Sequence, residues 1–449
     1  MTSKPVEPPP EGSVAPSAPG PPGTARPSRS WRASAPRLRR SLRAFGPGII
    51  TGAADDDPAG IATYSIAGAQ FGTGLLWLAP VTWPMMAAVQ AMCARVGMVT
   101  GGGLMDALRP RLPRPLLMLV AASLLCANTF NVGADLAAMA DAAELLTSVD
   151  SRVWVVAFGF GLAGATMALH YTTIARMLRW LALVLLAYVA TAFLVGPDWG
   201  AVARATLLPT LPRSREAWAV VVAVLGTTVS PYLFFWQSSE EVEEELALGR
   251  SRREDRFGAT TAELRTRALD VGIGTFASNL AFFFIVLTTA LTLHPHGMTH
   301  PETTTEVAAA LRPLAGPYAT ALYTVGIVGT GALAIPTLAG SAAYAVAELF
   351  GWHEGMDERP SGAPGFYTVF ALSIAGAMAM SLVDSSPVRA LYWSAILNGL
   401  LAPFLLVAIL AVASDPVIMA GQPSSRTARM MVLLTACAMF VAAGAMFLL

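Results

Sequence analysis

Three consecutive carboxylates lie inside an apolar segment near the start of the chain. Residues 45–72 have the length of a membrane span, and Asp55, Asp56 and Asp57 lie in the middle of it. An ionisable side chain at the centre of a membrane costs at least ~2.5 kcal/mol, so it usually faces a cavity or an ion path. The pattern predicts a cation site with Asp57 as its main ligand, and with Asp55 and Asp56 as direct or water-mediated ligands.

Pro58, Ala59 and Gly60 follow these carboxylates directly. Proline removes a backbone donor and glycine relaxes the backbone, so a helix is expected to unwind here. Bare carbonyls inside a membrane are tolerated only where they line a cavity or hold an ion. The break is therefore expected to turn backbone carbonyls toward such a site.

A second apolar segment, residues 217–237, is interrupted in the same manner by a proline among small polar residues. Two interrupted segments in corresponding positions of two halves are the best sequence indication of a transporter site. Alternatively, each proline only kinks a packed helix, although a kink does not explain Asp57. The second interruption contains Thr227, Thr228 and Ser230, followed by Pro231 and Tyr232.

The composition is that of a polytopic membrane protein. Of 449 residues, 55% are hydrophobic and 13% are charged, whereas soluble domains have about 25% charged residues. The net charge is zero, which gives no indication of a nucleic-acid partner, and no obligatory protein partner is evident. We expect no enzymatic activity and no cofactor, because no nucleophile–base pair or zinc-ligand spacing is present. Core packing is the expected role of Cys93, Cys126 and Cys437.

The predicted fold is all-α with eleven membrane spans, preceded by a disordered cytosolic tail at residues 1–43 that is rich in proline and arginine. The two interrupted spans open two halves of five spans each, at residues 44–196 and 217–413. Since five is odd, the halves have opposite topology and form an inverted repeat, with an extra helix at 429–449. The spans are expected near 45–70, 74–99, 116–147, 153–170, 178–195, 217–238, 270–293, 318–350, 365–383, 388–413 and 429–449.

Arginine and lysine give the predicted orientation. With the N-terminus in the cytosol, most of the 29 basic residues fall in cytosolic segments, which satisfies the positive-inside rule. The chain is then expected in the inner (plasma) membrane with its C-terminus outside. The basic residues left for the outer loops are Arg152, Arg204, Arg213, Arg215, Arg312 and Arg389.

Five segments in order resemble the Nramp family of divalent-metal transporters, over roughly residues 42–413. The resemblance implies a leucine-transporter-like arrangement of the ten repeated spans, with the lipid bilayer and a divalent metal ion as the partners. It rests on Gly68–Gly72, Gln90 with 94–101, 134–137, 226–238, and Ala339, Gly340 and Glu348.

The family's two ligand motifs are altered in this chain. The first motif, Asp-Pro-Gly-Asn, corresponds to residues 57–60 and ends in Gly60, and the second, Met-Pro-His, begins with Ser230. The resemblance implies that the family's methionine is a soft ligand for transition metals, and its loss leaves oxygen ligands only. These are the Asp57 carboxylate, the carbonyls near Ala54 and Thr227, and the hydroxyls of Thr227, Thr228 or Ser230. Hard cations prefer oxygen, and Mg²⁺ keeps several of its waters. The chain thus resembles the Nramp-related magnesium transporters, and Mn²⁺ is the second expected substrate.

The proton route implied by the family is also altered. The family's two histidines and an acidic residue correspond to Tyr232, Gln237 and Ala138, while Asp135 is retained. Histidine is the side chain suited to proton exchange near neutral pH. We therefore expect cation uptake without obligatory proton coupling. The Mg²⁺ or Mn²⁺ ion bound at the site is then the transported substrate itself.

Several other polar residues leave two interpretations open. Asn398 and Ser394 either bind a water of the hydrated ion or pack between helices, and Gln237 is a further candidate for a water or supporting contact. Asp135 is either a remnant of the proton path or a partner of Arg95. The acidic residues of 239–268 form either a solvated helix end or a cation-collecting vestibule. His294, His296 and His300 are expected to be ordinary loop residues.

The predicted function is transport of divalent cations into the cytosol by alternating access, with Mg²⁺ first and Mn²⁺ second. A proton-coupled Mn²⁺ or Fe²⁺ importer is the alternative within this class. A membrane receptor that binds a cation without transporting it is the alternative outside it.

Overall fold

The computed structural model describes residues 47–169, 184–210, 213–382 and 386–448. These residues form helices and connecting loops without a strand, which confirms the all-α class. The tail at 1–43, His170 and the start of the fifth predicted span lie outside the described residues.

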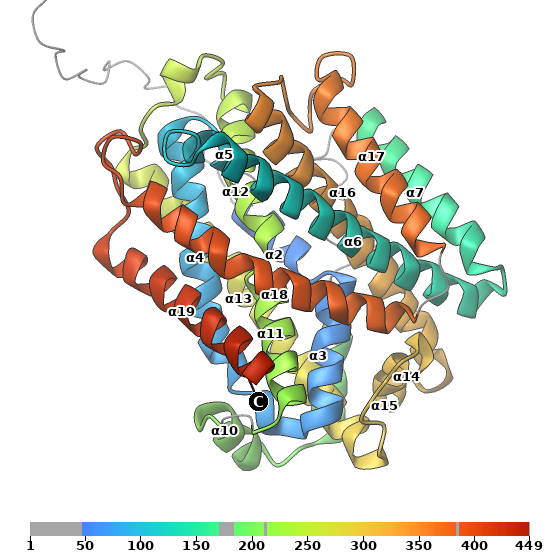
Figure 1. Cartoon of the computed structure of the whole chain (residues 1–449). Coiled ribbons are helices and arrows are strands. Elements are labelled where there is room, and N and C mark those ends of the chain that lie inside the picture. The colour runs from blue at the N-terminus through green and yellow to red at the C-terminus, as the bar shows by residue number, and fades with distance from the viewer. Residues whose placement is uncertain (1–46, 170–183, 211–212, 383–385, 449) are drawn as a thin grey trace, which may run out of the picture. The chain divides into compact units, whose positions relative to one another are not determined.

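Each predicted span corresponds to a helix or to two consecutive helices (Figure 1). The first half contains α2 (Pro47–Asp55), α3 (Pro58–Phe71), α4 (Leu78–Thr100), α6 (Arg114–Thr147), α7 (Ser151–Ala168) and α9 (Leu186–Val195). The second half contains α11 (Arg215–Thr228), α12 (Pro231–Ala247), α13 (Thr261–Thr292), α16 (Ala319–Phe350), α17 (Pro364–Ser381) and α18 (Pro387–Ala413), and α19 (Arg426–Leu448) follows. Short helices in the connections are α5 (Leu104–Leu108), α10 (Trp199–Leu207), α14 (Thr304–Ala308) and α15 (Arg312–Ala315).

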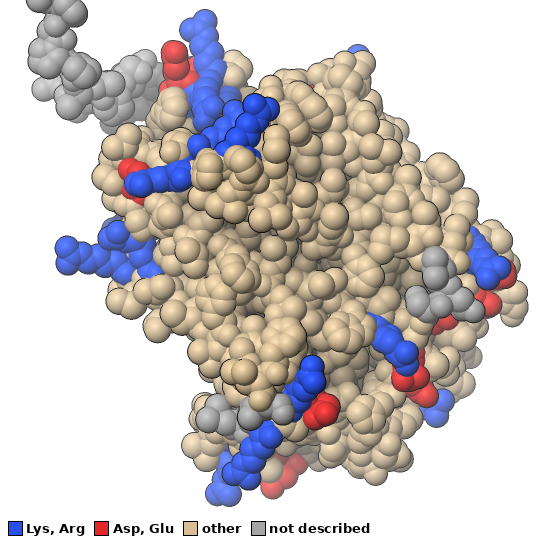
Figure 2. All heavy atoms as spheres, viewed as in Figure 1, with Lys and Arg blue, Asp and Glu red and all other residues tan. Residues whose placement is uncertain are grey.

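The described helices have the length and composition of membrane spans. Eight of the described helices are long and apolar enough to cross a membrane, when α11 with α12, and α14 through α16, are each counted as one helix. The helices α3 and α4 meet at a bend of 115° and give a ninth span if they are counted together. Charged side chains on the face in Figure 2 gather toward the two ends of these helices and leave a broad uncharged band between them. Such a band suits the hydrocarbon core of a bilayer.

Both interrupted spans are broken at the predicted prolines, but the breaks are short. Only Asp56 and Asp57 separate α2 from α3, and only Val229 and Ser230 separate α11 from α12. The breaks are short because each proline is the first residue of the next helix, where its fixed φ and missing N–H are compatible with helix.

Glycines bring the interrupted helices into close contact with their neighbours. A Cβ at Gly226 of α11 would overlap the backbone of α18 at Ala395 and Gly399, and a Cβ at Gly52 of α2 would overlap Gly274 of α13. Close backbone approach through small residues is the usual packing mode of membrane helices. The two breaks are thereby held in the interior, between α6, α13 and α18.

Candidate cation-binding site

Asp57 caps the helix that follows the first break. Its backbone is extended, and its Oδ1 accepts the Gly60 amide at 2.7 Å. Its Oδ2 accepts a hydrogen bond from Asn131 Nδ2 of α6 at 3.3 Å, and Asn131 in turn accepts one from the Ser394 hydroxyl of α18 at 2.6 Å. Asp57 is 3% exposed, so these contacts fix a buried carboxylate between three helices.

Asp135 lies beside the same helix end. It is one turn after Asn131, so both project from one face of α6 toward the first break. Its carboxylate faces the Ala59 amide without a hydrogen bond of normal geometry, and both of its oxygens are fully buried. Arg95, its proposed partner, instead donates from Nε to the Gln422 carbonyl at 3.2 Å. Asp135 is therefore placed with the candidate site and not with Arg95.

Asp55 and Asp56 share one partner on α13. The Ser278 hydroxyl lies 2.6 Å from Asp55 Oδ2 and 3.0 Å from Asp56 Oδ1. A hydroxyl has one proton and donates to one acceptor at a time. One carboxylate of this pair is therefore incompletely satisfied by the protein.

The second break turns its hydroxyls back on its own helix. Ser230 Oγ lies 2.8 Å from the Gly226 carbonyl and 2.6 Å from the Thr227 carbonyl and can donate to either of them, and Thr228 Oγ1 donates to the Val224 carbonyl at 2.9 Å. All of these groups are buried. The carbonyl end of α11, which carries the negative end of the helix dipole, therefore points into the interior.

Two hydrogen bonds join the breaks. Tyr232 of α12 donates to the Ala54 carbonyl at 3.0 Å, and Thr227 Oγ1 donates to the Tyr64 hydroxyl of α3 at 3.2 Å. The Ala54 and Thr227 carbonyls were predicted to lack hydrogen-bond donors, but Tyr232 donates to the Ala54 carbonyl and Ser230 lies within hydrogen-bond distance of the Thr227 carbonyl. An accepting carbonyl keeps a second lone pair, so both remain able to bind a cation.

Several buried oxygens around the breaks have no protein partner. Besides both oxygens of Asp135, they are Asp55 Oδ1, Thr51 Oγ1 of α2 and Asn398 Oδ1 of α18, which lies one turn after Ser394. Buried polar atoms usually have a hydrogen-bond partner, so these oxygens are available to bind a cation or a water. Among the described residues, no group of three or more His, Cys, Asp or Glu is close enough to hold a metal. Neutral oxygens or waters would have to complete any coordination shell.

Gln237 belongs to a different network. Its amide donates to Glu241 at 2.7 Å, and Glu241 is paired with Arg267 of α13 at 2.7 Å. Arg267 also binds Glu244 and Asp270, and Asp270 accepts the Gly48 amide at the start of α2 at 2.9 Å. This cluster ties α2, α12 and α13 together at one end of the bundle.

The acidic end of α12 is not a solvated helix end. Glu240 and Glu241 are only 8% and 1% exposed, because α12 packs between α4 and α16 and continues to Ala247. Nearby, Glu348 of α16 accepts the Met105 amide of α5 at 2.8 Å. In the loop after α16, burial and the carboxylate of Glu348 raise the pKa of Glu354 well above its ordinary value.

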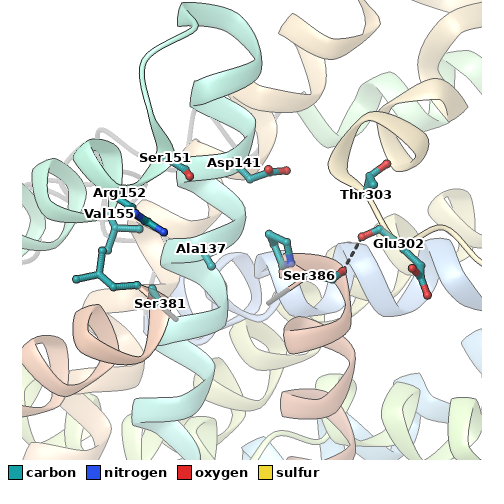
Figure 3. A pocket seen from close by; sticks show the side chains of 11 residues that line it. Ala137, Asp141, Ser151, Arg152, Val155, Glu302, Thr303, Ser381 and Ser386 are labelled. Carbon is teal, nitrogen blue, oxygen red and sulfur yellow. Dashed lines mark hydrogen bonds between the residues drawn. The ribbon is translucent and has the colours of Figure 1, made fainter. Parts of the chain in front are cut away.

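A cavity of about 350 Å³ opens at the end of the bundle that carries α14 (Figure 3). Asp141 of α6 and Glu302 line it, and the Glu302 carbonyl accepts a hydrogen bond from Ser386 at 2.6 Å. Asp135 lies six residues before Asp141, or ~9 Å deeper along the helix. Arg152 also lines the cavity, which lies on the side predicted to be external.

The histidines after α13 lie in short turns away from the breaks. His294 Nδ1 is 2.8 Å from the Ala69 carbonyl, and His300 Nδ1 is 3.1 Å from the Gln70 amide. His296 is bonded to the Thr292 carbonyl of its own helix end. His294 and His300 thus contact the end of α3, and the three histidines do not form a metal cluster among the described residues.

Sequence reasoning missed three residues that contact the breaks. Asn131 contacts Asp57, Ser278 contacts Asp55, and Tyr64 contacts Thr227. The two residues of each pair are far apart in the chain. Asn131 had a usable signal, since it precedes Asp135 by one helical turn. Ser278 and Tyr64 had none, because single polar residues in apolar helices are common.

A family model described as natural resistance-associated macrophage protein-like matches residues 48–449. The divalent metal cation transporter MntH of Yersinia enterocolitica is 28% identical over 320 residues, which are 66% of this chain and 70% of that protein. The MntH protein of Pectobacterium carotovorum is 28% identical over 313 residues, with the same coverage.

Solved structures share the fold. The manganese transporter of Eremococcus coleocola superposes with a TM-score of 0.72 at 15% identity, covering 90% of this chain and 86% of that one. The nucleobase-cation symporter Mhp1 superposes with a TM-score of 0.52 at 16% identity, covering 89% and 92%. The leucine-transporter-like arrangement of the ten repeated spans is therefore confirmed.

Proposed function

Because the chain belongs to the Nramp family, we propose that it transports divalent cations into the cytosol by alternating access, with Mg²⁺ preferred and Mn²⁺ also carried. It is a multi-pass membrane protein, and its matched relatives are named as transporters and not as enzymes. In this proposal it lies in the plasma membrane with the N-terminus in the cytosol, and transport does not require a coupled proton.

The oxygen-only composition of the two breaks is the observation that carries the proposal. The first break offers carboxylates and the Ala54 carbonyl, and the second offers the Thr227 carbonyl and the hydroxyls of Thr228 and Ser230. Neither break contains sulfur or imidazole. Oxygen ligands suit Mg²⁺ and tolerate Mn²⁺, whereas thioether and imidazole ligands favour softer transition metals.

The partly satisfied oxygens favour a hydrated ion. Mg²⁺ dehydrates reluctantly and is usually bound by one or two carboxylates while it keeps several waters. Asp57 is already held by Gly60 and Asn131, and Asn398 and Thr51 have oxygens without a protein partner. Waters of the ion can bind these oxygens, so a small set of direct ligands suffices.

The positions of the histidines support transport without proton coupling. His294, His296, His300 and His353 lie in loops or short turns, and not in the interior of a described membrane helix. A doubly charged ion that crosses a potential of ~100 mV gains about 4.6 kcal/mol. The membrane potential alone is therefore sufficient to drive uptake.

Uptake into proteoliposomes tests the proposal. The purified chain is reconstituted with a Mg²⁺ indicator or a pH indicator inside, and a potential, negative inside, is applied. We expect Mg²⁺ and Mn²⁺ to enter without internal acidification. Mn²⁺ uptake with stoichiometric acidification and no Mg²⁺ uptake would replace this proposal with the proton-coupled one, and no uptake of any ion would favour a receptor.

Ser230→Met tests the ligand chemistry in the same assay. A thioether at this position is expected to raise the ratio of Mn²⁺ or Cd²⁺ uptake to Mg²⁺ uptake, because sulfur favours softer ions. Met139→Leu is the matched control, since Met139 and Pro58 both pack against Gly331 beside the first break. An unchanged ratio in Ser230→Met would remove Ser230 from the ion path.

A proton-coupled Mn²⁺ importer is the second candidate function. Asp135 favours it, because this carboxylate is fully buried beside the first break without a hydrogen bond of normal geometry. Such a group can carry a proton when the ion site opens. Asp135→Asn separates the candidates, since only the proton-coupled mechanism predicts that this change abolishes acidification.

A further inference from the structure

A cavity between α4, α13 and α19 differs from the ion path in its chemistry. It has a volume of about 190 Å³ and lies at the start of α19, near the end of the bundle where α5 is found (Figure 1). Most of its described lining is apolar, and Arg95, Arg267, Ser424 and Ser425 supply the polar groups. No carboxylate is among the described residues that line it.

Arg95 is the cation that this cavity leaves available. Arg267 is already paired with Glu241, Glu244 and Asp270. Arg95 has only its Nε engaged among the described residues, and the acceptor is a neutral carbonyl. A half-buried guanidinium without a carboxylate therefore borders the cavity and favours an anion that can accept several hydrogen bonds.

Ser424 adds an independent indication of a ligand. Its side chain is 3% exposed and lines the cavity, yet its hydroxyl has no hydrogen-bond partner. A buried hydroxyl usually has one, and leaving it unpaired costs free energy. The Ser424 hydroxyl is thus available to donate a hydrogen bond to a bound ligand.

The N-terminal end of α19 also favours the binding of an anion in this cavity. Ser425 accepts the Ala428 amide at 3.2 Å, and α19 continues for 23 residues from Arg426. The amide end of a helix attracts anions. Arg429, one turn further on, has a buried Nε without a partner among the described residues.

The surroundings of the cavity identify the anion as part of a lipid. Leu269 of α13 and Met430 of α19 are 68% and 57% exposed, and each lies within two residues of a lining residue. Basic pockets between membrane helices on the cytosolic side bind anionic headgroups. We propose that this cavity binds the phosphate of an anionic phospholipid of the cytosolic leaflet, with the acyl chains along the exposed apolar faces of α13 and α19.

Lipid retention and thermal unfolding in detergent test this site. The full-length chain is delipidated, and phosphatidylglycerol, phosphatidylcholine or inorganic phosphate is added before native mass spectrometry and melting. We expect phosphatidylglycerol alone to be retained and to raise the Tm. Equal effects of phosphatidylcholine, or an equal effect of inorganic phosphate, would overturn the proposal.

Variants locate the effect in the cavity. Arg95→Gln is expected to weaken phosphatidylglycerol binding about five-fold, and Ser424→Ala and Ala91→Leu, which removes space without changing charge, are expected to weaken it as well. Arg252→Gln, an exposed arginine outside the cavity, is the control and should bind normally. If Arg95→Gln does not fold, Ser424→Ala and Ala91→Leu decide the matter. Normal binding in all cavity variants would contradict the proposal, and the readout does not depend on ion transport.

Discussion

The two helix breaks have the same backbone geometry but opposite side-chain chemistry. Asp57 and Ser230 occupy the same position, the extended residue before a proline that begins a helix. Asp57 bonds forward to the amide of Gly60, whereas Ser230 bonds backward to the carbonyls of Gly226 and Thr227. The reason is chemical, because a carboxylate can only accept a hydrogen bond and a hydroxyl can also donate one.

Under the proposed function, this difference gives the two breaks different roles in cation binding. The first break supplies charge and is braced by other helices, through Asn131 and Ser278. The second supplies neutral oxygens at the negative end of α11 and is braced by its own helix. Two carboxylate-rich breaks would repel one another without an ion, while two neutral breaks would bind a divalent ion weakly.

Asp57→Asn should have the largest effect on transport. The amide keeps the shape but removes the charge, so we expect Mg²⁺ uptake to fall by at least about 100-fold. Ser230→Ala should cost less than about 10-fold, because the Ser230 hydroxyl is already bonded within its own helix end. Both are measured in the proteoliposome assay.

Asp198→Asn is the matched control for this prediction. Asp198 caps α10 away from the breaks, and asparagine caps a helix as well as aspartate does. If Ser230→Ala lost as much activity as Asp57→Asn, the division between a charged and a neutral break would be wrong.

Alanine at the glycine of each break should separate them in stability. A Cβ at Gly226 would overlap backbone atoms of α18, which cannot move away, so Gly226→Ala should lower the free energy of unfolding by about 1–3 kcal/mol. A Cβ at Gly60 would come no closer than 3.3 Å to any neighbouring atom, the closest being side-chain atoms of Asp57 and Tyr64. Melting in detergent should show a clear fall for Gly226→Ala and a smaller one for Gly60→Ala. Equal falls would mean that both breaks are packed equally tightly.

The sequence predicted the position of both breaks because proline acts locally. Pro58 and Pro231 each begin a helix, and a residue before proline is biased to extended backbone. The breaks are only two residues long, since proline at the first position of a helix ends one helix and begins the next without further unwinding.

The partners of the breaks depended on tertiary packing. Ser278 reaches Asp55 across 223 residues, and Tyr232 reaches Ala54 across 178 residues. No local pattern distinguishes these hydroxyls from those that bond within their own helix, as Thr275 does with Val271. The burial of Glu240 and Glu241 was missed because a run of glutamates suggests solvent exposure until a partner such as Arg267 is found.

Asn131→Ala should have an intermediate effect on transport. It removes the contact from α6 that orients Asp57, and loss of such a supporting contact typically costs 10- to 100-fold in metal affinity, so about 10-fold is expected. Thr228→Val removes one neutral hydroxyl of the second break and should lower the apparent Mg²⁺ affinity less than Asn131→Ala does. Concentration-dependent uptake measures both. A larger loss in Thr228→Val than in Asn131→Ala would show that the second break also needs external support.

Tyr232→Phe should have the smallest effect and tests the link between the breaks. The Tyr232 hydroxyl occupies the Ala54 carbonyl at 3.0 Å, and one such hydrogen bond contributes about 1 kcal/mol to stability. Without Mg²⁺ the Tm of the variant should therefore be slightly lower than that of the wild type. With Mg²⁺ the freed carbonyl can bind the ion more strongly, so the rise in Tm on adding Mg²⁺ should be larger in the variant. A Tm rise equal to that of the wild type would show that Ala54 does not contact the ion and that the second break only braces the first.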